Sequence, residues 1–518
     1  MAPFPHGVDP GFKGMKGGIF PPAHAFSWTG CRWPLKHTIT PLRPLAVGNI
    51  SGGLVFNKIR QEKPFFWYWI FMNYRVSSYR WVIVSLLSLS YLLVYVHRMC
   101  PAVLVGDLIR SFNASGAVAG LMASAYFYPY ALMQVPVGII ADKLGARLLV
   151  TICMCMAAVG SLLFSMADSV TTAFFSRVLV GLGVSAVLVP TYKALTAWFP
   201  SRQYVMAASL VLSIAGLGGV VAGSPLAWIS EWIGWRSSFQ VLAGLTFLNG
   251  LLVWLFVRNK PQDFGLSPAE PELKEPGLPL QRPAAGKTIG MILANRDFRL
   301  LAVWFFLNGG VMFSFVGLWA GPYFIQVYGM SKTSAGSVIN LFSLGWVFGP
   351  ILFGWLATRF NSHGRILGLS MSALAALTLW LLVRNGSMCL PEIYAYNLLF
   401  GLVGAGPAGV CFAGAKERFP VQIAGTVTGL IYVFPMAGSA MFQPLAGAIL
   451  DRCGNLESGL SSGDFSALFL LYFVSCCLAG AAGFMLRREN PSGRLKMPAS
   501  AHNVSPSRNV CAFSPGTE

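Results

Sequence analysis

Long runs of apolar residues constrain this chain more than any other feature of its sequence. Several approach or reach the roughly 20 residues that cross the apolar core of a bilayer. Examples are residues 81–96, 148–167, 241–257, 366–382 and 467–486. Because no water reaches the peptide groups in that layer, each run is predicted to form a helix. The chain is therefore predicted to be an all-α membrane protein.

Composition excludes the main soluble alternatives. Only 11% of the residues are charged, against about 25% in a typical soluble domain. This is too few charged side chains to cover the surface of a water-soluble protein. The net charge of +19 comes from Lys and Arg in tails and connectors, with no basic stripe interleaved with aromatics that would indicate nucleic acid. The ten cysteines lack metal-ligand spacing, so neither a metal nor a cofactor is expected.

Polar breaks divide the chain into twelve predicted spans. They lie near residues 81–107, 116–138, 148–167, 169–190, 204–229, 238–257, 299–326, 334–357, 365–383, 391–414, 422–450 and 466–486. The predicted organisation is a basic, disordered cytoplasmic tail (1–79), a first six-helix half (80–257), a Pro-rich cytoplasmic linker (258–295), a second half (296–487) and a cytoplasmic tail (488–518). The first tail has no signal-peptide pattern, and the sequence leaves open whether the mature protein retains it.

The second half repeats motifs of the first at an offset of about 216 to 220 residues. The matching pairs are residues 138–147 with 354–365, Phe199-Pro200 with Phe419-Pro420, and 225–227 with 444–446. Such a repeat indicates duplicated architecture, so the two halves are predicted to be pseudo-symmetric.

Basic residues in the short connectors predict the orientation of the chain. With both tails in the cytoplasm, the connectors on that side carry Lys143, Arg147, Lys193, Arg202, Arg359, Arg365, Lys416 and Arg418. An excess of Lys and Arg marks the cytoplasmic side of a membrane protein. We expect a multi-pass protein of the plasma (inner) membrane, although the sequence does not specify which cellular membrane.

The segment Gly138-Ile-Ile-Ala-Asp-Lys-Leu-Gly-Ala-Arg147 closely resembles the signature between spans two and three of the major facilitator superfamily. The resemblance implies a cytoplasmic latch that stabilises the outward-facing state, with gating residues Gly138, Asp142, Lys143, Gly145, Arg147 and, from the second-half copy, Arg359. In that copy Thr358 replaces the acid, which predicts a weaker latch. A simple membrane turn carrying positive charges is the alternative.

Within residues 80–487, further motifs resemble the organic anion:cation symporter branch of this superfamily. Tyr95-Val-His-Arg98, followed by Pro101-Ala102, resembles its Tyr-x-x-Arg motif, and Arg177 precedes a matching Gly-Leu-Gly in span four. Residues 234–236 and 258–261, at the ends of spans five and six, also resemble segments of proteins in this branch. This resemblance implies secondary transport of a small solute by alternating access.

Two arginines are the strongest candidates for solute contact. Arg98 and Arg177 both lie roughly 12 to 15 Å below the outer boundary of their spans, at about 1.5 Å per helical residue. An arginine facing lipid would cost at least about 2.5 kcal/mol, so both are predicted to face an aqueous cavity or an anion. The guanidinium fork suits a carboxylate or phosphate. Outward snorkelling, or a structural pair with Asp107, is the alternative.

Other polar and aromatic residues extend the predicted solute site. They are Tyr95, Tyr126, Tyr130, Gln134, Asn308 and Asn397, for which interior packing is a serious competitor. No Asp or Glu lies deep in a predicted span, so His97 and Asp107 are the candidates for proton coupling. A coupling cation, a protonated substrate, exchange and facilitated diffusion remain open.

The resulting hypothesis is a monomeric carrier of a small organic anion, most simply a carboxylate. Span seven has no Lys or Arg in its middle, which argues against a phosphate substrate. A carrier of neutral or zwitterionic solutes (a sugar, amino acid or dipeptide) and a non-transporting solute receptor on the same scaffold are the alternatives. An enzyme is not expected, because the sequence has no HExxH motif and no clustered acidic metal motif. The solute and the direction of transport cannot be read from the sequence.

Overall fold

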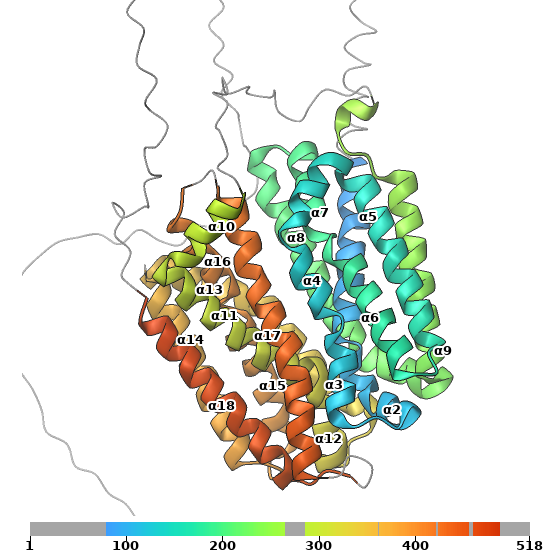
Figure 1. The fold of residues 1–518 in the computed structure, drawn as a ribbon, viewed down its shortest axis with the longest axis vertical. Coiled ribbons are helices and arrows are strands. Elements are labelled where there is room, and N and C mark those ends of the chain that lie inside the picture. The colour runs from blue at the N-terminus through green and yellow to red at the C-terminus, as the bar shows by residue number, and fades with distance from the viewer. Residues whose placement is uncertain (1–78, 265–284, 361, 421–422, 455–458, 487–518) are drawn as a thin grey trace, which may run out of the picture. The chain divides into compact units, whose positions relative to one another are not determined.

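A computed structural model describes residues 79–264, 285–360, 362–420, 423–454 and 459–486 (Figure 1). Helices account for all the regular structure within these ranges, and no strand occurs in them. The two predicted tails, apart from Tyr79, and linker residues 265–284 lie outside the described ranges. The predicted all-α fold is therefore confirmed.

The first half contains six crossings, which we number in chain order. Crossing 1 is the helix Tyr79–Met99 followed by α2 (Pro101–Phe112). Crossing 2 is α3 (Gly116–Ser124), α4 (Phe127–Met133) and the start of α5 (Pro136–Ser165), whose remainder is crossing 3. Crossing 4 is α6 (Val170–Ser185) with α7 (Leu188–Trp198), crossing 5 is α8 (Ser201–Ala222) with the start of α9 (Ser224–Phe256), and crossing 6 is the rest of α9.

The second half follows the same plan. Crossing 7 is α11 (Arg296–Ser314), the π-helical turn η2 (Phe315–Trp319) and α12 (Ala320–Tyr328). Crossings 8 and 9 are α13 (Lys332–Phe360) and α14 (His363–Val383), and crossing 10 is α15 (Leu390–Ala405) with α16 (Ala408–Glu417). Crossings 11 and 12 are α17 (Ala424–Cys453) and α18 (Ser462–Phe484).

Two glycines make the sharp turns that separate consecutive crossings in the first half. Gly145 (φ 73°) ends crossing 2 within α5, and Gly234 (φ 80°) ends crossing 5 within α9. A positive φ is accessible to glycine at little cost and is strained for residues with a Cβ. Eleven helices of the described residues are long and apolar enough to cross a membrane. Crossing 2 is the twelfth. Breaks near Ala125 and Gln134 divide it into helices that are each too short to cross the membrane alone.

The linker contains two short helices that the sequence analysis did not predict. Its first residues form the 3-10 turn η1 (Pro261–Phe264), and its last residues form α10 (Ala285–Ala294). Crossing 7 then begins where the side chain of Asn295 accepts a hydrogen bond of 2.9 Å from the Phe298 amide, which is ordinary N-capping.

The two halves lie side by side and meet at the end where α2, α3 and α12 lie (Figure 1). We call the end with Gly145 the turn end and the opposite end the seam end. There, Asp451 at the end of α17 accepts hydrogen bonds from the amides of Gly116 (2.6 Å) and Ala117 (2.8 Å) at the start of α3. An acid at a helix N-terminus satisfies free amides and interacts favourably with the helix dipole.

Further polar contacts join the halves at the seam end. Lys332 at the start of α13 forms an ion pair with Asp107 of α2 and a hydrogen bond of 3.2 Å to Ser230. Next to it, Glu231 accepts a hydrogen bond of 2.9 Å from the Thr333 hydroxyl. We call this set of contacts, with those of Asp451, the seam.

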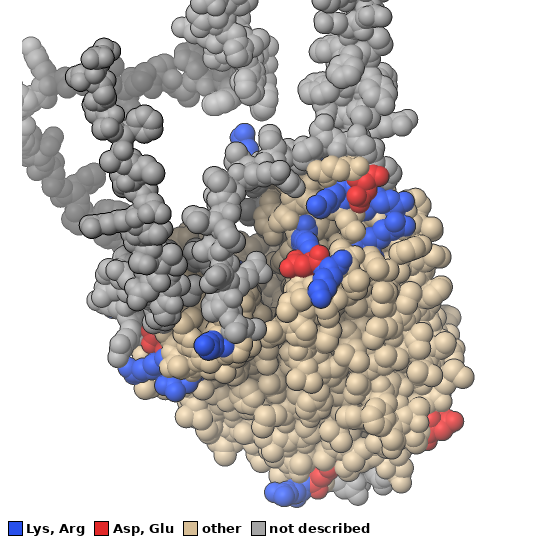
Figure 2. Space-filling view, turned by 45° about the horizontal axis from the view of Figure 1, so that its top comes forward, with Lys and Arg blue, Asp and Glu red and all other residues tan. Residues whose placement is uncertain are grey.

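Bare backbone also forms part of the seam. A Cβ at Gly447 of α17 would overlap the carbonyl oxygen of Gly116, and a Cβ at Gly120 of α3 would overlap that of Gln443. Crossings 2 and 11 therefore touch backbone to backbone, a contact that small residues allow between membrane helices. At the turn end, by contrast, the space-filling surface is hollowed between the halves (Figure 2).

Candidate functional site

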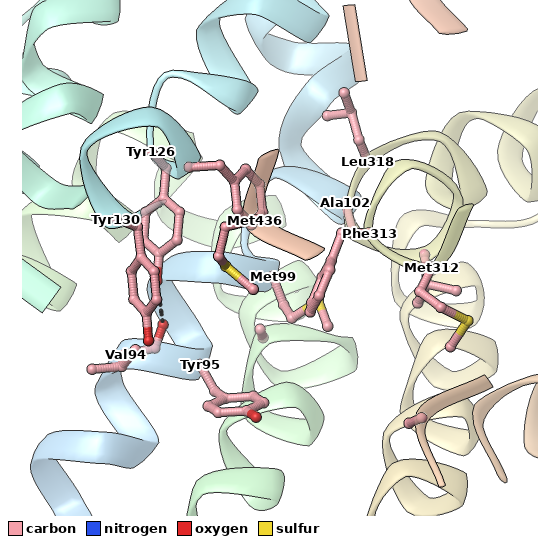
Figure 3. Packing of buried hydrophobic residues seen from close by; sticks show 14 of the residues in the cluster. Val94, Tyr95, Met99, Ala102, Tyr126, Tyr130, Met312, Phe313, Leu318 and Met436 are labelled. Atoms are coloured by element: carbon pink, nitrogen blue, oxygen red, sulfur yellow. Dashed lines mark hydrogen bonds between the residues drawn. The ribbon is translucent and has the colours of Figure 1, made fainter. Parts of the chain in front are cut away.

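Arg98 lies in crossing 1, two residues before its break at Cys100. Its side chain is only 1% exposed. The guanidinium carbon lies 4.9 Å from the ring centroids of Tyr95 and Tyr130, 5.5 Å from that of Phe313 and 5.9 Å from that of Tyr126. Three rings come from the first half and one from the second, and we call these four residues the aromatic cage (Figure 3).

The cage leaves the hydrogen-bonding capacity of Arg98 unused. None of its three guanidinium nitrogens has a hydrogen-bond partner among the residues that the structure describes, although the group carries five N–H donors. Ring faces attract a cation by about 0.5–2 kcal/mol, which is small beside the cost of a buried, uncompensated charge. The site is therefore electrostatically incomplete and suited to an anion.

Arg177 is also buried, at 2% exposure, but its donors are already used. Both terminal nitrogens donate to the carbonyl oxygen of His97 at 3.2 Å. Both arginines contact the Tyr126 ring, whose centroid lies 5.4 Å from the Arg177 guanidinium carbon and 5.9 Å from that of Arg98. The two arginines share this ring but differ in their hydrogen bonding.

The two residues predicted for proton coupling lie in different places. His97 is fully buried within the first half, where Nε2 lies 3.0 Å from the Thr246 hydroxyl and Nδ1 lies 3.3 Å from that of Ser161. Because Thr246 also donates to a backbone carbonyl, this pattern fits a ring protonated on Nε2. Asp107 lies in the seam and pairs with Lys332, so its structural partner is a lysine and not Arg98.

The predicted tyrosines gather in the first half, and Gln134 turns back on its own helix. Tyr126 and Tyr130 are stacked, with centroids 5.8 Å apart, and the Tyr130 ring lies 6.2 Å from that of Tyr432 across the half interface. The Gln134 amide donates to the backbone oxygen of Tyr130 at 3.1 Å. Interior packing and solute contact both remain compatible with these positions.

The predicted second-half asparagines bond within that half. Asn308 donates to the carbonyl oxygen of Gly404 at 2.9 Å. Asn397 donates to the carbonyl oxygen of Ile393 at 2.9 Å, and its own buried oxygen has no hydrogen-bond partner in the described part of the chain. Gln443 of the second half is bonded to a cage residue, because its amide donates to the carbonyl oxygen of Phe313 at 3.0 Å.

The predicted latch bonds within the first half in this conformation. Asp142 is 68% exposed and pairs with Lys193 at 2.9 Å. The amide of Arg147 donates to the Asn259 side chain at 2.9 Å, and its guanidinium lies 4.3 Å from the Trp254 ring. Gly145 supplies the turn itself. Arg359, at the end of α13 in the second-half copy, is exposed.

Sequence reasoning did not find Phe313 or Lys332. Phe313 lies in an apolar run and carries no distinguishing signal in one sequence. Lys332 does have a signal, because it is a basic residue at the start of a span on the side with few basic residues. Its pairing with Asp107, 225 residues away in the chain, depends on how the halves meet.

Comparison with known proteins agrees with this architecture. A solved bacterial homologue of the human lysosomal transporter Spinster, inward-facing and occupied, is 17% identical, covers 81% of this chain and 99% of its own, and has a TM-score of 0.63. This similarity concerns the fold alone.

Among sequence relatives, the hexuronate transporter of Escherichia coli (strain K12) is 23% identical over 83% of this chain and 98% of its own. The membrane sensor protein UhpC of the same strain is 24% identical over 77% of this chain and 93% of its own. The model of the Major Facilitator Superfamily matches residues 87–435. With twelve crossings in two repeated halves around a shared central site, the chain belongs to the Major Facilitator Superfamily.

Proposed function

We propose that this protein carries a small organic anion, most simply a carboxylate, across the membrane by alternating access. The observation that carries the proposal is Arg98, a fully buried guanidinium for which the described residues provide neither a hydrogen-bond acceptor nor a counter-charge. A carboxylate would supply both, since its two oxygens match the guanidinium fork. The charge of the solute would then compensate the buried cation during passage.

The aromatic cage explains how both halves would take part in binding. Tyr95, Tyr126 and Tyr130 belong to the first half, whereas Phe313 belongs to the second. A rocking motion of one half against the other would move Phe313 relative to Arg98 and change access to the guanidinium. Binding and conformational change would therefore be coupled through differential contacts in the two states.

The distribution of charge supports a cytoplasmic turn end. Figure 2 shows Lys and Arg gathered at this end of the first half, as the positive-inside rule requires. The described conformation would then be open to the cytoplasm and closed on the outside by the seam. In a plasma membrane this is the state that releases an imported solute or receives an exported one.

Of the two residues predicted for proton coupling, Asp107 is better placed to act on the conformational change. Its ion pair with Lys332 joins the two halves, so protonating the carboxylate would weaken the seam. The imidazole of His97 contacts two hydroxyl groups of its own half. We therefore propose Asp107 as the coupling residue if protons are used.

The relatives support a carboxylate as the solute, and one of them also supports a second function, that of a solute receptor. A hexuronate is a sugar acid, so the named cargo of one relative carries the group that Arg98 would bind. Another relative is named as a membrane sensor, which supports a solute receptor that binds without net transport. Binding and flux must therefore be measured separately.

Uptake into proteoliposomes tests the proposed function. With radiolabelled glucuronate as probe, we expect saturable uptake that unlabelled glucuronate inhibits and equimolar glucose does not. Binding to the detergent-purified protein without uptake would support the receptor. Competition by glucose as strong as that by glucuronate would reject an anion site and favour the neutral-solute carrier.

Asp142 provides a separate test of the latch. Asp142→Asn should reduce flux several-fold, because loss of one charge–dipole contact, worth about 1 kcal/mol, destabilises the outward-open state. Thr358→Ala, at the matching position of the second half, should reduce flux much less. Solute affinity in detergent should be unchanged in both proteins. Small and equal effects on flux, at equal surface expression, would remove the gating role.

A further inference from the structure

We infer that Arg177 is a positioning residue, which replaces a backbone hydrogen bond missing from crossing 1 and so fixes the helix that carries Arg98. The inference rests on the proposed function, because it assigns solute contact to Arg98 and a supporting role to Arg177. It differs from the sequence prediction that both arginines serve as counter-charges.

The missing bond follows from the sequence around the break. In a helix the carbonyl of residue 97 would accept from the amide of residue 101, but that residue is Pro101, which has no N–H. The backbone stays close to helical here, with Cys100 at φ −56° and ψ −29°. The His97 carbonyl is therefore left without its usual donor in a position where a donor could reach it.

Arg177 supplies the replacement from crossing 4. Its two terminal nitrogens converge on the His97 oxygen at 3.2 Å each, and the Cys100 thiol adds a weaker contact at 3.4 Å. An unpaired buried carbonyl costs about 1–3 kcal/mol, so this contact stabilises the proline break. Arg98 immediately follows His97, so whatever fixes this peptide also fixes the direction of the Arg98 side chain.

The ring contacts of the two arginines differ. Both contact Tyr126, but Arg177 also contacts the Phe164 ring inside the first half, at 5.8 Å, whereas Arg98 contacts Phe313 of the second half. Crossing 7 has a comparable arrangement, because Gln443 of crossing 11 donates to the Phe313 carbonyl just before the π-helical turn. Crossings 1 and 7 are thus each bonded near their irregularity by a side chain of another helix in the same half.

A double-mutant cycle between Arg177 and Pro101 tests the inference. Arg177→Met should lower the affinity for glucuronate by about tenfold, the effect of one unpaired buried carbonyl. Pro101→Ala restores an N–H to the His97 carbonyl, so the same Arg177→Met change made in the Pro101→Ala protein should cost much less. If Pro101→Ala does not fold, Pro101→Ser supplies the same N–H.

The matched control is Arg98→Gln made with and without Pro101→Ala. The loss of glucuronate affinity caused by Arg98→Gln should be the same with Pro101 and with Pro101→Ala, because Arg98 does not bond the His97 carbonyl. An Arg177→Met loss of equal size in both backgrounds would overturn the positioning role and indicate that Arg177 acts through its charge alone.

Thermal unfolding of the solute-free proteins gives a second measure of the cycle. Arg177→Met should lower the melting temperature more in the Pro101 protein than in the Pro101→Ala protein. This measure does not involve the anion, so it tests the positioning role even if glucuronate fails to bind and the proposed function is wrong. Equal shifts in both backgrounds would reject the inference.

Discussion

Arg98→Gln is expected to weaken binding of the anion by about 3–5 kcal/mol, which is roughly a hundred- to several-thousand-fold in Kd. The large effect follows from the buried position of Arg98 and its lack of any other partner. Arg98→Lys should recover only part of the affinity, because lysine keeps the charge but loses the planar fork. Isothermal titration of glucuronate into the purified variants measures the effect.

The same substitution should raise the stability of the solute-free protein. Removing a buried charge that has no partner removes its desolvation cost, so the melting temperature without solute should rise while the shift caused by glucuronate disappears. A residue needed only for folding would behave in the opposite way. Arg384→Gln is a suitable control, because Arg384 is exposed and pairs with Glu392 at 3.1 Å. Retained glucuronate affinity and flux in a folded Arg98→Gln protein would refute the anion site.

Gly447→Leu is expected to keep the seam from closing. A side chain at this position would overlap the backbone of Gly116 and Ala117, and overpacking of this kind costs about 3 kcal/mol. This energy shifts the balance between open and closed seams by roughly a hundred-fold. Flux should fall by at least about tenfold, because the conformation described here would become rare.

Spin labels at Asn113 and Ser331, both exposed at the seam end, can follow this change. In a background without native cysteines, distances between the labels should lengthen in Gly447→Leu. Gly244→Leu is the matched control, because a Cβ at Gly244 would meet nothing within 4 Å. Unchanged distances with normal flux in Gly447→Leu would show that the seam tolerates the side chain.

Much of the fold could be predicted because the membrane limits what an apolar run can form. The repeat predicted two halves of six helices each, and the Gly138–Arg147 motif contains the glycine that makes the turn, Gly145. Crossing 2 was also predicted, although breaks near Ala125 and Gln134 divide it into helices too short to cross the membrane alone. The linker helix α10 had no comparable signal, since it is short and does not cross the membrane.

The site could be predicted only in part. Counting residues along a span gives depth, and Arg98 and Arg177 do lie close to the same ring. Depth does not give the partner of a side chain, however. That Arg177 bonds the His97 carbonyl depends on the angle between crossings 1 and 4. That Phe313 completes the cage depends on contact between halves that are far apart in the sequence.

The backbone contacts of the seam have a consequence for how the specificity of such a protein can diverge. Gly116, Gly120 and Gly447 close one end of the molecule through main-chain atoms, which are the same whatever solute is carried. The cage around Arg98 consists of side chains that can change without altering that closure. New cargo preferences could therefore evolve by substitutions in the cage while the machinery of closing stays intact.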